Sequence, residues 1–283
     1  MTVFRLRWGP WSLDLGTRPF IMGVINVTPD SFSDGGDCYT AEAAVAQGLR
    51  LAQAGADILD VGGQSTRPGS RGIGEAEEKA RVIPVIEGLA ARVDIPLSID
   101  TYYASVAQAA LEAGAAMVND ISAGRFDPDL LRVCGRAEAP LVLMHMKGRP
   151  LDMQVNPVYE DLLGEIKAFL ADAVFRAEAA GVRRDRLILD PGIGFGKTFE
   201  HNLILLNRLN VLAELGRPLL VGHSRKAFIG HILGGVPPKE RDVATAALAA
   251  LAVYNGAHLI RVHNVELTRP AVTAAWAIKN EHA

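Results

Sequence analysis

The stretch PLSIDTYYASVAQAALEAGAAMVNDI, residues 96–121, contains one complete strand–helix–strand unit. Residues 96–101 and 117–121 are short apolar runs, as is typical of parallel strands that are buried on both faces. The alanine-rich residues 104–115 between them have helical periodicity and close on Gly114, a residue type that often follows a helix C-terminus. The stretch therefore predicts a βαβ unit of a parallel sheet.

The same alternation continues along the chain, where about eight such βα units follow one another. The other apolar runs of strand length are residues 20–26, 57–63, 140–146, 187–192, 218–224 and 259–264. No Ser/Gly-rich linker or change of composition divides the sequence. We therefore predict one (β/α)8 TIM barrel, formed as a single domain by residues 1–283, over the alternatives of an open sheet or two doubly wound domains.

A short segment precedes the first βα unit. Residues 5–8 and 11–15 alternate in polarity on either side of Gly9-Pro10, which predicts an N-terminal β-hairpin over about residues 3–15. We expect this hairpin to close the lower mouth of the barrel.

Composition restricts the partners. The 29 basic and 32 acidic residues give a net charge of −3, which provides no general positive field for a nucleic acid or an anionic membrane. The first residues lack the apolar core of a signal peptide, and the most apolar helical stretch, residues 243–253, is too short to span a bilayer. Cys38 and Cys134 form no zinc-binding spacing. We expect a cytoplasmic protein without nucleic-acid or membrane partners.

Polar side chains stand at almost every predicted strand end, where a parallel barrel carries its catalytic groups. Asp, Ser and Thr at such ends can be caps of the following helices, and for Asp100 a cap after Thr101 is nearly as good an interpretation as a ligand contact. Capping does not explain a further set of poor capping residues, namely Asn26, Arg67, Lys226, Arg261 and His263. These side chains could converge on one cavity.

The acceptors among these groups fit a nitrogen heterocycle. Asp100, Asn119 and Asp190 can accept hydrogen bonds from the donor edge of an amino-pyrimidine ring, and Lys226 can donate to its carbonyl oxygen. An ionised Asp without a partner in a barrel mouth is costly, so a ligand rich in donors is the natural occupant.

A second group fits an anion. Arg261 and His263 lie two positions apart on one strand and therefore point the same way. Together with Asn26 and residues 65–67 they could surround a phosphate or diphosphate. The side-chain oxygen of Asn26 also suits a hard cation such as Mg²⁺ that bridges phosphate oxygens.

Two glycine-rich segments carry further predictions. Residues 190–197, DPGIGFGK, match neither the P-loop nor the dinucleotide-binding spacing. Their glycines would let the backbone approach a flat ligand with Phe195 covering one face, although a plain βα turn is the alternative. Residues 27–36 are polar and rich in Pro and Gly before a helix that begins near Thr40, and we predict that they form a lid.

Eight motifs occur in one order along the chain: GVINVTPDSFSDGG, STRPGS, SIDT, VNDI, LMHMKGRP, DPGIGFGKTFEHN, GHSRKAFIG and RVHN. Over about residues 20–270 the chain thereby resembles the dihydropteroate synthases of folate biosynthesis. The resemblance implies a TIM barrel, usually a homodimer. It also implies a transferase that joins 6-hydroxymethyl-7,8-dihydropterin diphosphate to 4-aminobenzoate with the help of Mg²⁺, releasing diphosphate and forming 7,8-dihydropteroate.

The resemblance also implies roles for individual residues. The pterin would be bound by Asp100, Asn119, Met144, Asp190 and Lys226. The diphosphate would be bound by Asn26, Thr66, Arg261 and His263, with Asn26 as the ligand of Mg²⁺. The 4-aminobenzoate would contact Arg67, Pro68, Phe195 and Ser224. The catalytic groups would be Asp100, Lys226 and Arg67, in an SN1-like displacement that needs no obligatory general base.

Two residues depart from the pattern of that family. Gln64 stands where Glu is common, and Asn264 stands where Asp is frequent. Two other functions stay open: a methyltetrahydrofolate-type pterin methyltransferase, which would have no use for the diphosphate-binding residues, and a pterin-binding module without turnover.

Overall fold

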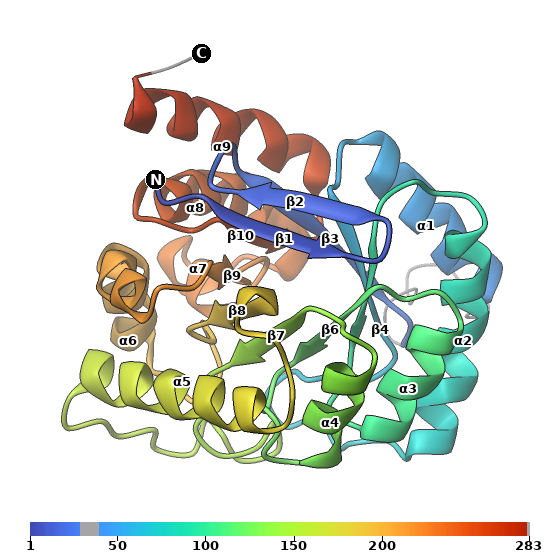
Figure 1. Ribbon diagram of the computed structural model, residues 1–283. Coiled ribbons are helices and arrows are strands. Elements are labelled where there is room, and N and C mark those ends of the chain that lie inside the picture. Colours follow the sequence, from blue (N-terminus) through green and yellow to red (C-terminus); the bar gives the residue numbers. More distant parts are fainter. Residues whose placement is uncertain (29–39, 282–283) are drawn as a thin grey trace.

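A computed structural model describes residues 1–28 and 40–281 of the chain. Its main feature is an eight-stranded sheet in which every pairing is parallel (Figure 1). The strands are β3 (Phe20–Asn26), β4 (Ile58–Gly62), β5 (Leu97–Asp100), β6 (Met117–Asp120), β7 (Leu141–Met144), β8 (Leu187–Asp190), β9 (Leu220–Val221) and β10 (Leu259–Val262). They are ordered β8-β7-β6-β5-β4-β3-β10-β9.

The sheet curves into a barrel whose last seam joins β8 to the segment before β9. Leu189 forms a parallel bridge with Leu219, and the Leu189 amide donates to the Pro218 carbonyl oxygen at 2.9 Å. The predicted (β/α)8 barrel is thereby confirmed, with eight strands that close almost completely. The open-sheet alternative is wrong, because its two edges would remain apart.

The strand predicted over residues 218–224 is much shorter than expected, since its ladder covers Leu220–Val221. Beyond it the chain turns outward, because the His223 ring hydrogen-bonds the Thr245 carbonyl oxygen and Arg225 adopts a left-handed φ of 59°. This early turn carries Ser224 and Lys226 over the barrel mouth rather than along the sheet.

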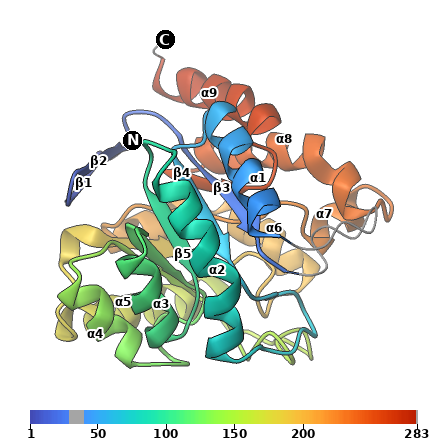
Figure 2. The same cartoon turned by 90° about the vertical axis from the view of Figure 1, so that its right-hand side faces the viewer.

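Helices surround the strands, and Figure 2 shows α1 and α2 outside the strands β3, β4 and β5. Thr40 caps the first helix by accepting a hydrogen bond from the Ala43 amide, which confirms the helix start predicted near Thr40. The helices are α1 (Ala41–Gln53), α2 (Glu75–Ala90), α3 (Ala104–Glu112), α4 (Asp129–Arg136), α5 (Leu162–Ala179), α6 (Phe199–Asn207), α7 (Ala227–Ile232), α8 (Asp242–Tyr254) and α9 (Val265–Asn280). Short 3-10 turns are η2 (Arg184–Arg186), η3 (Leu209–Leu215) and η4 (Pro238–Arg241).

The N-terminal hairpin consists of β1 (Phe4–Trp8) and β2 (Trp11–Leu15), which pair antiparallel. Its inward side chains form one apolar cluster with residues at the amino ends of the barrel strands. The cluster contains Leu6, Trp8, Leu13, Leu15, Phe20, Met22, Ile58, Met117, Val142, Ile188, Leu220 and Leu259. The predicted hairpin and its position at the lower mouth are therefore confirmed, and the opposite mouth is left for polar groups.

No helix among residues 1–28 and 40–281 is long and apolar enough to cross a membrane.

Removing the hairpin's central side chain should destabilise the protein without altering its chemistry. Leu6 is 1% exposed within the apolar cluster, so Leu6→Ala should lower the free energy of unfolding by about 2–5 kcal/mol. Urea denaturation would measure this loss. The exposed Arg5→Ala on the same strand is the control and should change stability by no more than about 0.5 kcal/mol. Equal stability of Leu6→Ala and the parent would contradict the role of the hairpin as a plug.

Candidate active site at the carboxyl end of the barrel

A guanidinium lies between two carboxylates inside the barrel. Arg261 of β10 donates from Nε to Asp60 Oδ2 and from Nη2 to Asp100 Oδ2, both at 2.6 Å. Asn119 of β6 donates from Nδ2 to the same Asp60 oxygen at 3.0 Å, which leaves the side-chain carbonyl oxygen of Asn119 as a hydrogen-bond acceptor. One polar network thereby joins the strands β4, β5, β6 and β10. We use the name acceptor cluster for the three acceptors of this network together with Asp190, namely Asp60, Asp100, Asn119 and Asp190.

Asp60 is a site residue to which sequence reasoning assigned no role. It is fully buried in the middle of β4, between apolar neighbours. An ionisable residue inside an otherwise apolar strand needs a partner, and that was the available signal. What the sequence could not supply was the partner, because Arg261 lies 201 positions away.

The structure decides between the two interpretations of Asp100. Its carboxylate faces Arg261 inside the barrel, whereas the Ala104 amide at the start of α3 donates to Asp127 Oδ2 at 2.7 Å. The capping alternative for Asp100 is therefore wrong, because Asp127, in the loop between β6 and α4, accepts from the first turn of α3 instead.

Burial sets the charge states in the cluster. It raises the pKa of Asp100 to about 7, although Arg261 opposes the shift, and it raises the pKa of Asp190 against the opposing charge of Lys226. Burial also lowers the pKa of Lys226 to about 7, with Asp190 acting the other way. A carboxylate such as Asp100 and an amine such as Lys226 that change charge near neutrality are well suited to exchange protons with a ligand.

Lys226 stands at the edge of the cluster, at the start of α7. Its Nζ donates to the Ile193 carbonyl oxygen and lies 4.4 Å from the centroid of the Phe195 ring. Asp190 Oδ1 accepts from the Gly192 amide at 2.7 Å. The glycine-rich segment after β8 therefore contacts both predicted pterin-binding residues, Asp190 and Lys226.

An apolar wall completes one side of this space. Met144 and Phe195 belong to a buried cluster with Ile121, Met146 and Met153, and Tyr102 and Phe126 pack against it. Flat side chains and polarisable thioethers are suitable contacts for an aromatic ring. Ile121, Met146 and Met153 were not among the predicted site residues, because an apolar side chain after a strand has no chemical signal in the sequence.

Asn26, His263 and Ser224 form a hydrogen-bonded chain on the other side. Asn26 Nδ2 lies 3.2 Å from His263 Nε2, and Ser224 Oγ lies 2.9 Å from His263 Nδ1. Burial lowers the pKa of His263 to about 3, so the ring carries one proton, which Nδ1 donates to Ser224 while Nε2 accepts from Asn26. The Asn26 carboxamide oxygen and the Ser224 hydroxyl proton are then available to a ligand.

The loop between β4 and α2 carries Thr66, Arg67 and Pro68. Arg67 and Pro68 are exposed, and the positive charge of Arg67 contributes, after burial and other charges, to the lowered pKa of His263. Gln64 Oε1 accepts from the Ile73 amide at 2.8 Å and ties the two ends of this loop together.

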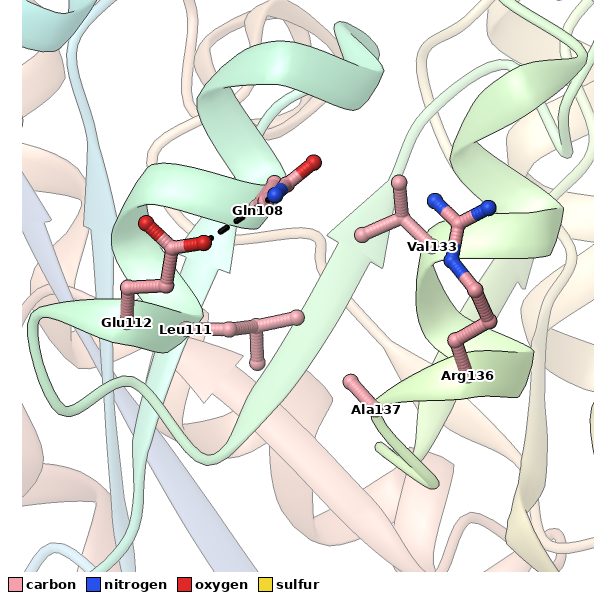
Figure 3. Close-up of a pocket in the computed structure, with 6 residues that line it drawn as sticks. All are labelled: Gln108, Leu111, Glu112, Val133, Arg136 and Ala137. Carbon is pink, nitrogen blue, oxygen red and sulfur yellow. Dashed lines mark hydrogen bonds between the residues drawn. The ribbon is translucent and has the colours of Figure 1, made fainter.

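One cavity lies near the rim of the barrel mouth, and another lies between helices of the outer layer. One of about 560 Å³ lies beside the loop after β4 and is lined in part by Gln64, Tyr102, Phe126 and Arg149. The other, of about 320 Å³, opens between α3 and α4 and contains none of the predicted site residues (Figure 3).

Of the predicted lid, residues 29–36 lie outside the described part of the chain, as does Cys38. Cys134 is buried with a free thiol.

Comparisons with known proteins agree with this geometry. Residues 22–263 match the model of the family described as pterin binding enzyme. The chain is 49% identical over 258 residues to a dihydropteroate synthase of Synechocystis, covering 91% of this chain and 89% of that protein. It is 43% identical to the Bacillus subtilis dihydropteroate synthase, covering 91% and 87%. The chain belongs to the dihydropteroate synthase family of pterin-binding enzymes.

Solved structures of dihydropteroate synthases are similar throughout. The Xanthomonas albilineans enzyme with 4-aminobenzoic acid superimposes with a TM-score of 0.92 at 48% identity, over 98% of this chain and 99% of that chain. The same enzyme in complex with 7,8-dihydropteroate gives a TM-score of 0.85 at 46% identity, over 95% and 96%. The predicted membership of this family is confirmed, and with it the prediction of a transferase.

We expect the affinity of this dihydropteroate synthase family member for a pterin to be highest near pH 7. Below that pH Asp100, with a pKa of about 7, gains a proton and loses an acceptor, and above it Lys226, also with a pKa of about 7, loses its charge. Each limb should change the dissociation constant by up to about tenfold per pH unit.

Calorimetric titration with a pterin across this pH range would measure the effect. Burial and the negative charges of Asp60 and Asp120 raise the pKa of Asp100, whereas the positive charges of Arg261 and Lys226 oppose that rise. Asp100→Asn should make the acid limb less steep, and Lys226→Met should remove the alkaline limb. An acid limb unchanged in Asp100→Asn would contradict the assignment.

Proposed function

We propose that this enzyme joins 6-hydroxymethyl-7,8-dihydropterin diphosphate to 4-aminobenzoate and releases diphosphate and 7,8-dihydropteroate, a step of folate biosynthesis. The observation that carries the proposal is the juxtaposition of two sites in one barrel mouth. The acceptor cluster fits the donor edge of the pterin, and the Asn26–His263–Ser224 chain with Arg67 fits the anionic groups of the substrates. The family membership of the chain supports the same reaction.

The pterin half of the substrate would enter the barrel. Its amino and ring N–H groups would donate to Asp100, Asn119 and Asp190, while Lys226 would donate to its carbonyl oxygen. Met144 and Phe195 would cover the ring from the apolar wall. Burial of these acceptors is compensated when a ligand with matching donors replaces water.

The diphosphate half would lie at the rim. The Ser224 hydroxyl and the guanidinium of Arg67 would be the donors to the diphosphate, while Arg261 already donates to Asp60 and Asp100 and would act on the substrate through its charge. Both ring nitrogens of His263 have protein partners, so its direct contact with diphosphate, like that of Thr66, stays a prediction.

The residues present fit a magnesium ion. The Asn26 amide nitrogen is engaged by His263, which leaves the carboxamide oxygen as the group that could bind a cation, and an amide oxygen is a ligand that Mg²⁺ accepts alongside water and phosphate oxygens. Bound there with the substrate, Mg²⁺ would neutralise the charge of the departing diphosphate. Asn26 is the protein group that would hold it.

The chain's own groups would then act by electrostatics. As the bond between the pterin methylene carbon and the diphosphate oxygen breaks, the electron pair leaves with diphosphate and a positive charge develops on the pterin. The carboxylates of the buried Asp190 and the partly buried Asp100 would stabilise that charge. The amine of 4-aminobenzoate, bound by Phe195, Ser224, Arg67 and Pro68, forms the new C–N bond and releases its proton to water.

The homodimer and the cytoplasmic location implied by the resemblance belong to the same proposal. Analytical ultracentrifugation of the purified protein would measure its oligomeric state and so test the homodimer.

Release of diphosphate should depend on both organic substrates and on Mg²⁺. A coupled assay for diphosphate, combined with chromatography of dihydropteroate, measures the reaction directly. Pterin binding without turnover would instead favour the non-catalytic module, and transfer of a methyl group from methyltetrahydrofolate would favour the methyltransferase.

Asn26→Ala should raise the Mg²⁺ concentration needed for half-maximal rate by at least about tenfold, because it removes the one protein oxygen assigned to the ion. Asn26→Asp keeps an oxygen at the same place and should retain Mg²⁺ dependence close to that of the parent. Titration of the initial rate with MgCl₂ measures both. An identical Mg²⁺ requirement in Asn26→Ala would remove Asn26 from the metal site.

A further inference from the structure

Lys197 is a buried lysine at the end of the glycine-rich segment after β8, and nothing so far gives it a function. Its side chain is 2% exposed. Its Nζ donates to His145 Nδ1 at 2.9 Å and to the Phe195 carbonyl oxygen at 3.0 Å, with the His145 carbonyl oxygen at 3.5 Å. One amino group therefore joins the end of β7 to the segment that carries Phe195.

The partner His145 is prepared to accept this hydrogen bond. It is buried, its ring lies edge-on to Phe169 with 4.8 Å between centroids, and burial followed by the charge of Lys197 lowers its pKa to about 2. The ring is therefore neutral at physiological pH, and Nδ1 offers a lone pair to Lys197.

The two joined segments touch along their backbones. A Cβ atom on Gly192, whose φ is +69°, would lie 1.9 Å from the His145 carbonyl oxygen, and one on Gly196, at +63°, would lie 2.4 Å from the Lys147 carbonyl oxygen. The segment can lie this close only because these positions are glycine. Gly192 and Gly196 have no side chains that could hold this segment in place, and Lys197 supplies hydrogen bonds that do so.

The segment in turn holds Lys226. The Ile193 carbonyl oxygen accepts from Lys226 Nζ, and the Phe195 ring faces the same ammonium at 4.4 Å. A shift of residues 193–195 would thus move both the aromatic cover of the mouth and the amine assigned to the pterin.

All three acceptors of the Lys197 amine are neutral. Burial lowers the pKa of Lys197 well below its usual value, and the negative charge of Asp190 opposes that shift. A residue that only filled this space could be methionine, which has no charge to desolvate. The free-energy cost of burying the Lys197 amine is instead offset by its hydrogen bonds to one side chain and two backbone carbonyl groups.

We propose that Lys197, with His145 as its acceptor, is a positioning residue for the reaction proposed above: it fixes residues 193–195 against the end of β7 and so sets the places of Phe195 and Lys226. It touches no substrate itself. The inference rests on the proposed function for the identity of the ligands, but the fixed segment is a property of the protein alone.

The experiment compares Lys197→Met with a control, Lys167→Met, which replaces a half-buried lysine of α5 that pairs with Glu214. Amide hydrogen exchange at Gly194 and Phe195, whose amides donate to Asn202 and Gly192, reads the segment directly. Exchange should be about tenfold faster in Lys197→Met and unchanged in Lys167→Met. This readout stands even if the parent forms no dihydropteroate, in which case the proposed function fails alone.

Steady-state kinetics test the link to Phe195. Lys197→Met should raise the KM for 4-aminobenzoate and lower kcat, each by about tenfold. Lys197→Met combined with Phe195→Ala should lose less than the two single losses together, because Lys197 acts in part through Phe195. Additive losses, or exchange unchanged at Gly194 and Phe195, would overturn the proposal.

A second pair of variants covers the case in which Lys197→Met does not fold. His145→Asn keeps an acceptor oxygen near the place of Nδ1, whereas His145→Phe keeps the ring and removes the acceptor. The Asn variant should behave like the parent in exchange and kinetics, and the Phe variant should show the losses predicted for Lys197→Met. Equal behaviour of the two would show that the hydrogen bond is dispensable and would also overturn the proposal.

Discussion

The guanidinium of Arg261, held between Asp60 and Asp100, is the interaction on which the polar half of the barrel depends. It brings together residues of β10, β4 and β5 that are 201 and 161 positions apart in the chain. Burial and the negative charge of Asp60 both raise the pKa of Asp100, and the positive charge of Arg261 opposes that rise. Without Arg261, Asp100 would hold its proton to a higher pH.

This arrangement divides the barrel into two ends of different character. At the amino ends of the strands, the hairpin residues Leu6, Trp8, Leu13 and Leu15 fill the interior with apolar side chains. That packing provides stability that owes nothing to the ligand. At the carboxyl ends, buried charges and hydrogen-bond acceptors reduce stability while the site is without a ligand. The apolar plug therefore permits a mouth that is organised for binding rather than for stability.

Much of the architecture could be predicted from the chain, because buried parallel strands and alanine-rich helices have different periodicities. The polar residues at strand ends were also predictable, since a parallel barrel gathers those ends at one mouth. The contacts between these side chains could not be predicted from the sequence. Whether Asp100 caps α3 or faces the interior depends on Asp127 and Arg261, and the joint role of Asn26, His263 and Ser224 depends on the distance between three strand ends. Such contacts arise only when the barrel closes, as does the early turn after Val221.

The two departures from the family pattern have a physical explanation in their surroundings. Asn264 accepts from the Leu267 amide with Oδ1, as Asp could, but it also donates from Nδ2 to Asp242 Oδ2 at 3.0 Å. An ionised Asp there would place two carboxylates against each other.

Asp242 is at the same time the bidentate partner of Arg225, which holds a left-handed φ of 59° between Ser224 and Lys226. The amide at position 264 therefore supports the turn that carries two site residues, and Gln64 similarly uses only its acceptor oxygen, toward the Ile73 amide. Both substitutions preserve acceptor contacts, and the one at 264 adds a donor where a neighbouring carboxylate can use it.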